Sequence, residues 1–332
     1  MIRAMNILRA FGIPGLLALP LTSYAHTRWF AVGTLSPHVS NEPTALYLIV
    51  WACIAFAIVL VGTHFERARI LSLAFLEPKK DHAFQRAAAS FSMVTGAFFL
   101  IAGTHHYVFS PNLSASLGMP EWLIVLQILI GISLLVGFFE RIAAIALMML
   151  WLPVLYYAGV VAALEDVWVL STAFFILVMG NDYFDMFPVR ALQRHVAFLR
   201  PYALPVLRWG TGVTLFVLGF SEKILHPEFG INFLSLYPWN FMQSLGFAYS
   251  DYLFTLSAGA VESLFGLIFM LGIVTRLNAL VLAVFFTIPI FILGPIELAG
   301  HMPHFAAVVL MLLFGAGEHF KMSVRHTARH RA

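Results

Sequence analysis

Long, uninterrupted apolar runs dominate the chain from residue 45 onward. A helix needs roughly 17–25 apolar residues to cross the hydrocarbon core of a bilayer. Runs near this length occupy 45–63, 87–107, 121–139, 141–163, 167–181, 205–225, 252–274, 277–296 and 301–317. They are continuous rather than alternating, which favours helices over the strands of a membrane barrel. We therefore expect an all-α, polytopic membrane helical bundle of about nine transmembrane helices.

The composition agrees with this pattern. Hydrophobic residues make up 61% of the chain and charged residues 11%, against about 25% charged in soluble domains, so the excess apolar surface must face lipid. The chain carries one cysteine, Cys53, so neither an internal disulfide nor a CxxC redox pair is possible. Any redox chemistry would need a cofactor, a metal or a partner protein.

The first 25 residues resemble a secretory signal peptide. Arg3 and Arg9 precede a short apolar stretch over 10–21, and Ser23 and Ala25 have the small side chains that signal peptidase favours. We expect cleavage after Ala25, which would leave 26–44 as a periplasmic segment. The alternative is an uncleaved anchor that adds a tenth helix.

The basic residues predict the orientation of the bundle. If the segment after residue 25 lies outside, the loops 64–86 and 182–204 and the tail 319–332 all lie inside. Together with Arg3, Arg9, Arg141, Arg208 and Arg276, which fall on the same side, this places 17 of the 19 Lys and Arg on the cytoplasmic side, with Arg28 and Lys223 as the exceptions. Such a bias obeys the positive-inside rule. It predicts a bacterial inner-membrane protein with a periplasmic mature N-terminus and a cytoplasmic C-terminus, and it explains the net charge of +3 without a nucleic-acid partner.

Two segments of the sequence repeat. Residues 103–111 align with 219–227 at an offset of 116, and 127–144 align with 262–279 at an offset of 135. The difference between the two offsets means that the second copy has 19 additional residues, around 231–250. We expect one helix followed by two parallel four-helix repeats, 87–181 and 205–318, in a 1 + 4 + 4 arrangement.

The second copy resembles a known family at these positions. Its residues are Gly219, Glu222 and Lys223, followed by Glu262, Gly266, Gly272 and Arg276. This pattern is similar to that of the DoxX/DoxD family of small four-helix membrane proteins, which includes quinone-linked oxidoreductase subunits. The first copy departs from it, with His106, Tyr107 and Gln127 in place of the Glu-Lys pair and the membrane Glu. The resemblance implies a tandem DoxX duplication whose second copy is the active unit.

Glu262, Lys223 and Glu222 are the candidate catalytic residues. Glu262 lies near the middle of its apolar run, where a charged side chain costs at least about 2.5–3.5 kcal/mol. It could accept protons or bind a ligand, or it could hold a neighbouring helix as a protonated hydrogen-bond donor. Helix rise alone separates its depth from that of Lys223 by about 9 Å, so we do not expect a direct ion pair between them.

Histidines gather on the outer side and suggest a metal site or proton relay. His301 and His304 share a face and, because Pro303 lies between them, we expect them at a helix N-terminus. His105 and His106 lie on the same side of the membrane. The alternative for each is an interfacial residue that faces water.

Two further expectations concern the outer side of the bundle. We expect His226 to form an outer polar rim with Glu165 and Asp166. After cleavage, the amino group and imidazole of His26, with His38, could bind copper.

Three functions remain open at this point. The first is a quinone-facing membrane subunit of a periplasmic redox system, in which Glu262, Lys223 and His304 contact the quinone and a periplasmic partner supplies electrons. The second is a copper-binding or copper-transfer membrane protein that uses His26. The third is a membrane scaffold for partner enzymes, which would dock on the aromatic segment 231–250. The pattern leaves the oligomeric state and the substrate open.

Overall fold

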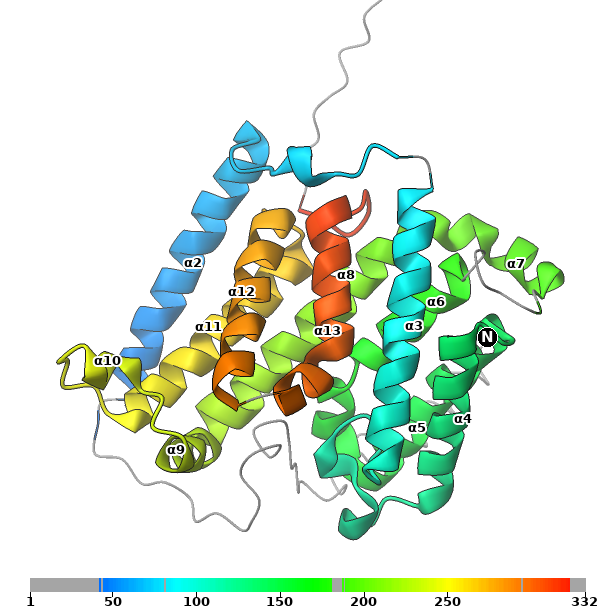
Figure 1. Ribbon diagram of the computed structural model, residues 1–332. Coiled ribbons are helices and arrows are strands. Elements are labelled where there is room, and N and C mark those ends of the chain that lie inside the picture. Colours follow the sequence, from blue (N-terminus) through cyan, green and yellow to red (C-terminus); the bar gives the residue numbers. More distant parts are fainter. Residues whose placement is uncertain are drawn as a thin grey trace, which may run out of the picture.

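The computed structural model describes residues 42, 44–80, 82–180, 187, 189–293 and 295–322, and this part of the chain is all-helical (Figure 1). The helices are α2 Thr44–Ala68, α3 Ala83–Thr104, α4 Glu121–Val136, α5 Glu140–Glu165, α6 Trp168–Met179, α7 Arg190–Val196, α8 Ala203–Leu218, α9 Pro227–Leu236, α10 Phe241–Ser244, α11 Asp251–Leu271, α12 Thr275–Leu293 and α13 Pro295–Phe314. The π-helix η6, Gly219–Leu225, continues α8 directly. Every apolar run found in the sequence coincides with one of these helices, so the expectation of a helical bundle is confirmed.

Five helical stretches in the described part of the chain are long and apolar enough to cross a membrane. They are Thr44–Ala68, Ala83–Thr104, Glu140–Glu165, Arg190–Leu225 and Asp251–Leu271. The apolar helices Glu121–Val136, Trp168–Met179, Thr275–Ile288 and Gly300–Phe314 are shorter. Together these helices indicate a protein that resides in a lipid bilayer.

Helix α2 shows the lipid-facing character most clearly. It lies along the outside of the bundle, where it packs against α11 (Figure 1). Its side chains Leu46, Phe56 and Leu60 are each more than half exposed. Apolar side chains exposed along a whole helix would be costly in water, so this surface is suited to lipid.

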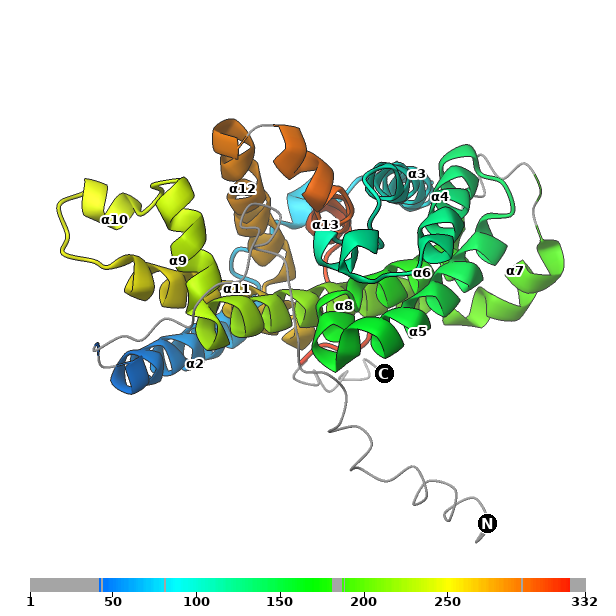
Figure 2. The same ribbon diagram turned by 90° about the horizontal axis from the view of Figure 1, so that it is seen from below.

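The links between the helices lie at the two ends of the bundle. Figure 1 shows the links 69–82 and 272–275 and the end of α13 at one end, and the link 105–120 with α9 and α10 at the other. Figure 2, which is the view from below, shows α9 and α10 projecting from one side and α7 from the opposite side. The basic residues Arg69, Lys79, Lys80, Arg276 and Lys321 belong to the first end.

Neighbouring helices form two similar sets of contacts. Helix α3 packs against α4, as α8 packs against α11, and α5 packs against α6, as α12 packs against α13. Between these sets, α6 packs against α8 and α3 packs against α13. The first helix of each set therefore lies beside the last helix of the other, and the core is continuous across all of them.

Glycines bring two of these helix pairs into backbone contact. A Cβ atom added to Gly96 of α3 would lie 2.7 Å from the carbonyl oxygen of Gly131 in α4. A Cβ atom added to Gly212 of α8 would lie 2.7 Å from the carbonyl oxygen of Gly266 in α11. Small residues that permit such contact are the usual means of helix association in membranes.

Buried arginines hold the carbonyl ends of several helices. Arg208, which is fully buried, donates hydrogen bonds to the carbonyl oxygens of Phe269 and Met270 at the end of α11, and to others beyond α13. Arg141 donates to Met179 at the end of α6, and Arg276 to Leu313 near the end of α13. The last carbonyls of a helix have no intrahelical partner, so these guanidinium groups satisfy atoms that would otherwise be unpaired in an apolar environment.

The glycine contacts make a testable prediction. Replacing Gly266 with alanine places a methyl group against the backbone of Gly212 and Phe216, so α8 and α11 must separate. We expect the free energy of unfolding in detergent to fall by about 1–3 kcal/mol. The control is Gly62→Ala in α2, whose added methyl group would meet Ile273 and Val274 at an ordinary 3.5 Å, and which we expect to leave stability unchanged or raise it by up to about 1 kcal/mol, because alanine favours a helix more than glycine does. Equal effects of the two variants would contradict the proposed importance of the α8–α11 contact.

Candidate functional site

Lys223 and Glu262 form an ion pair between η6 and α11. The Nζ atom of Lys223 donates a hydrogen bond to Oε2 of Glu262 at 2.5 Å. The expectation that these residues would not meet directly was therefore wrong. It used α-helical rise alone, whereas the wider i→i+5 turn of η6 advances less along its axis per residue and the long lysine side chain covers the remaining distance.

The glycine contact between the two helices explains why the pair can form. A Cβ atom on Gly259 would lie 2.6 Å from the carbonyl oxygen of Gly219 and 2.7 Å from Cβ of Lys223. The backbone of α11 thus lies directly beside the start of the lysine side chain. The two side chains are about one-fifth exposed, at 19% for Lys223 and 22% for Glu262, so the pair can be reached from the surface of the bundle.

Gln127 occupies the corresponding place between α3 and α4 and makes only neutral contacts. Its Oε1 accepts a hydrogen bond from the backbone N–H of Phe109 at 2.9 Å. Its Nε2 donates to the carbonyl oxygens of Tyr107 at 3.1 Å and Phe99 at 3.3 Å. Gln127 is fully buried, and these bonds fasten the link after α3 to α4. Gln127 therefore joins neighbouring segments through neutral hydrogen bonds, whereas Glu262, with which it aligns in the sequence, belongs to a charged, partly exposed pair.

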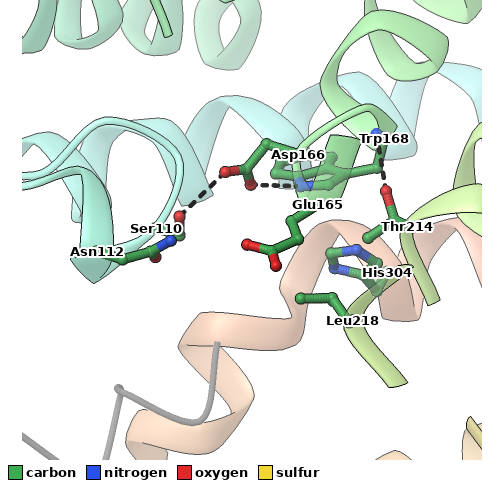
Figure 3. Close-up of a pocket in the computed structure, with 8 residues that line it drawn as sticks. All are labelled: Ser110, Asn112, Glu165, Asp166, Trp168, Thr214, Leu218 and His304. Atoms are coloured by element: carbon green, nitrogen blue, oxygen red, sulfur yellow. Dashed lines mark hydrogen bonds between the residues drawn. The ribbon is translucent and has the colours of Figure 1, made fainter. Parts of the chain in front are cut away.

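A second group of acids lies buried near the ion pair, where α5 ends and α6 begins (Figure 3). Glu165 and Asp166 are 3% and 4% exposed. Oε1 of Glu165 accepts a hydrogen bond from the Ser221 hydroxyl at 2.6 Å. The two carboxylate oxygens of Asp166 accept from the Ser110 hydroxyl and from the indole N–H of Trp168, each at 3.2 Å. The expected outer polar rim is thus wrong, because both acids point into the protein.

These acids line a small cavity between the helices. Its walls are Ser110, Asn112, Glu165, Asp166, Trp168, Thr214, Leu218 and His304 (Figure 3). The cavity measures about 10 Å³, which is room for about one water molecule. Its lining comes from the link after α3, from α5 and α6, and from α8 and α13, so it lies where these elements meet.

Some of the lining residues present buried polar atoms that lack a hydrogen-bond partner. They include Nδ1 of His304 and Oδ1 of Asn112, in side chains only 6% and 8% exposed. Figure 3 shows the His304 ring opposite the Glu165 carboxylate, and its centre lies 5.1 Å from that of the Trp168 ring. Buried polar groups normally find a partner, so this cavity is a candidate binding site.

Glu165 connects the cavity to the ion pair. It lines the cavity and binds Ser221, which precedes Glu222 and Lys223 in η6. Glu222 is 1% exposed, and both Glu165 and Glu222 lie close enough to Lys223 to interact with it electrostatically. The four carboxylates and the lysine therefore form one polar region, which extends from the centre of the bundle to the accessible face of α11.

Within the described ranges, the histidines expected on the outer side do not gather into one site. His301 and His304 have ring centres 6.5 Å apart, and only His304 lines the cavity. Helix α13 begins at Pro295 and contains Pro303, so the expected helix start at these histidines was wrong. His105 and His106 are exposed at the end of α3, and Nδ1 of His226 pairs with Oε1 of Glu228 at 3.0 Å.

No group of three or more His, Cys, Asp or Glu side chains that could hold a metal occurs in the described ranges. His26 and His38, with the expected signal peptide, lie outside those ranges.

Sequence reasoning missed most of the cavity. It did not identify Ser110, Asn112, Trp168 or Thr214, whose hydroxyl oxygen accepts a hydrogen bond from the Trp168 backbone N–H at 3.0 Å. A signal was nevertheless present, because Glu165 and Asp166 fall in a very short link between two apolar runs. A link this short has few residues with which to place both acidic side chains outside the protein.

Comparisons with models of known protein families, with characterised proteins and with solved structures find no match. The geometry and the sequence therefore carry the functional argument.

Asp166 makes stability depend on pH. Burial raises the pKa of this carboxyl from 3.8 to about 7, against the opposing effect of the hydrogen bonds from Trp168 and Ser110. Between these values the folded protein holds a proton that the unfolded chain releases, so the free energy of unfolding falls as pH rises from about 4 to beyond 7, by an amount on the order of a few kcal/mol. We expect Asp166→Asn to flatten this slope in thermal unfolding scans.

The control for this experiment is the exposed Glu318→Gln, which should leave the slope unchanged. Glu165, Glu222, Lys223 and His304 are the other titratable groups near the cavity, and they stay the same in both variants. An Asp166→Asn protein with the full wild-type slope would assign the pH dependence to one of those groups.

Proposed function

We propose that this protein is a membrane subunit of a redox system, in which the Lys223–Glu262 pair contacts a lipid-soluble quinone and exchanges protons with it. The observation that carries the proposal is the position of this pair. It is a charged pair on an apolar helix pair, partly exposed at the surface, and continuous with buried carboxylates. Ionisable groups within membrane segments are expensive, and for that reason they usually mark pathways for protons or substrates.

We further infer the 1 + 4 + 4 architecture of two DoxX-like repeats. The glycine pairs support it, because Gly96 and Gly212 are separated by the same 116 residues as the aligned segments, and Gly131 and Gly266 by the same 135. The two sets of helix contacts, with α6 beside α8 and α3 beside α13, are those expected of parallel repeats related by an axis along the membrane normal.

The end of the bundle that carries most of the basic loops would then face the cytoplasm. On this orientation the cavity and the ion pair lie toward the periplasmic end of the bundle. A periplasmic partner protein would supply the electrons. Since the chain has one cysteine, it offers no dithiol of its own for this purpose.

The residues present fit a quinone at the ion pair but not in the cavity. A cavity of about 10 Å³ cannot admit a quinone ring, whereas the exposed face of the pair can be reached from the lipid. A bound quinone would supply the two-electron acceptor, and its reduction consumes two protons. Lys223 can donate a hydrogen bond to a carbonyl oxygen, and Glu262 can hold a proton beside it. Glu222 and Glu165 extend the chain of groups that can hold a proton into the protein.

The copper hypothesis rests on His26 and His38 and stays a prediction of the sequence. The scaffold hypothesis rests on 231–250, where Leu236, Tyr237, Phe241 and Phe247 are exposed. An exposed aromatic segment at the end of a membrane bundle is also typical of an element at the lipid–water interface, so it does not favour docking.

Quinone binding by the purified protein in lipid nanodiscs tests the proposal. We expect saturable binding of a ubiquinone analogue, and Lys223→Met should weaken it about 10–100-fold, because a hydrogen bond from a charged donor contributes roughly 1.5–3 kcal/mol.

The control variant is Lys321→Gln, which removes a lysine from the opposite end of the bundle and should bind as the wild type does. If the wild-type protein shows no saturable binding, or if Lys223→Met binds equally well, the proposed quinone contact is wrong.

A further inference from the structure

The cavity between the helices has a chemical character distinct from that of the ion pair. Among the atoms that line it, the amide oxygen of Asn112 and Nδ1 of His304 have no hydrogen-bond partner. An amide oxygen only accepts hydrogen bonds or coordinates cations, and a neutral imidazole nitrogen can do the same. The carboxylates of Glu165 and Asp166 lie beside them. The surroundings therefore favour an occupant that carries positive charge or donates hydrogen bonds.

The size of the cavity restricts that occupant. About 10 Å³ admits a single particle of the size of water. An organic cation is too large. A transition metal is also disfavoured, because the described residues provide no group of three His, Cys, Asp or Glu ligands, whereas hard cations accept amide, hydroxyl and carboxylate oxygens.

The nearby lysine does not fill this role. Lys223 is not among the residues that line the cavity, and its Nζ is directed to Glu262 at 2.5 Å. Ser110 and Trp168 donate hydrogen bonds to Asp166. The amide oxygen of Asn112 receives no hydrogen bond. A cation inside the cavity would add to the positive charge that two adjacent buried acids favour.

We propose that this cavity binds one monovalent metal cation, of which Na⁺ is the representative, through Oδ1 of Asn112 and the carboxylates of Glu165 and Asp166. The neighbouring hydroxyls of Ser110 and Thr214 provide further oxygen atoms. The site lies where the link after α3, the α5–α6 link, α8 and α13 meet, so a bound cation would fasten these elements to one another. This inference does not depend on quinone binding at Lys223 and Glu262.

Thermal unfolding of the full chain in detergent tests the cation site. Titration with NaCl, at an ionic strength kept constant with N-methylglucamine chloride, should raise the Tm by about 2–5 °C and then saturate, because a ligand that binds only the folded state stabilises it by mass action. Asn112→Leu should reduce this rise to less than about 1 °C. The matched control Asn232→Leu lies on α9, away from the cavity, and should keep the full rise.

A second variant keeps the test valid if Asn112→Leu does not fold. Asn112→Asp retains an oxygen at the site and adds negative charge, so it should saturate at a lower Na⁺ concentration than the wild type. If the Tm is the same in Na⁺ and N-methylglucamine chloride, a water molecule fills the cavity and the proposal fails. It also fails if Asn112→Leu keeps the full Na⁺ effect, because the cation then binds elsewhere. Neither outcome bears on the quinone experiment.

Discussion

The backbone contact between α8 and α11 is the constraint on which the polar region depends. Gly212 and Gly219 on one helix face Gly266 and Gly259 on the other, and no side chain separates the two backbones. A lysine that follows such a contact starts its side chain against the neighbouring helix. The positions of these glycines thus bring Lys223 close to Glu262. Electrostatic attraction between the two side chains acts only after the glycine contact has placed them together.

An apolar environment makes each unpaired charge or carbonyl costly, and the protein meets this cost in two ways. At one end, Arg141, Arg208 and Arg276 satisfy the terminal carbonyls of three helices. At the other, buried acids are surrounded by hydroxyl and indole donors from several different helices. The first arrangement fixes the helices in place, whereas the second surrounds a small cavity that Asn112 and His304 line with unpaired polar atoms. It is the end with the cavity that offers room for chemistry.

Sequence patterns predicted the helices well, because membrane helices are set by the length of apolar runs, whereas the glycine contacts that decide which helices touch came from the structure. The Lys223–Glu262 pair could not be predicted, since the π-helical turn of η6 leaves no mark in hydropathy. The burial of Asp166 and the role of Asn112 depend on the α5–α6 link and the link after α3 meeting across the bundle. No local sequence pattern predicts a contact between these two links, so the contact is seen only in the folded structure.

The π-helical turn of η6 also affects how the Lys223–Glu262 pair could be gained or lost by mutation. In η6 each hydrogen bond spans one more residue than in an α-helix, so the segment holds one residue more than regular helix would need for the same turn. Deleting one residue there would restore α-helical bonding and leave the helix beyond it facing nearly the same way, but it would change which side chains of η6 itself face α11. A single inserted or deleted codon therefore decides which residue of η6 lies beside Glu262.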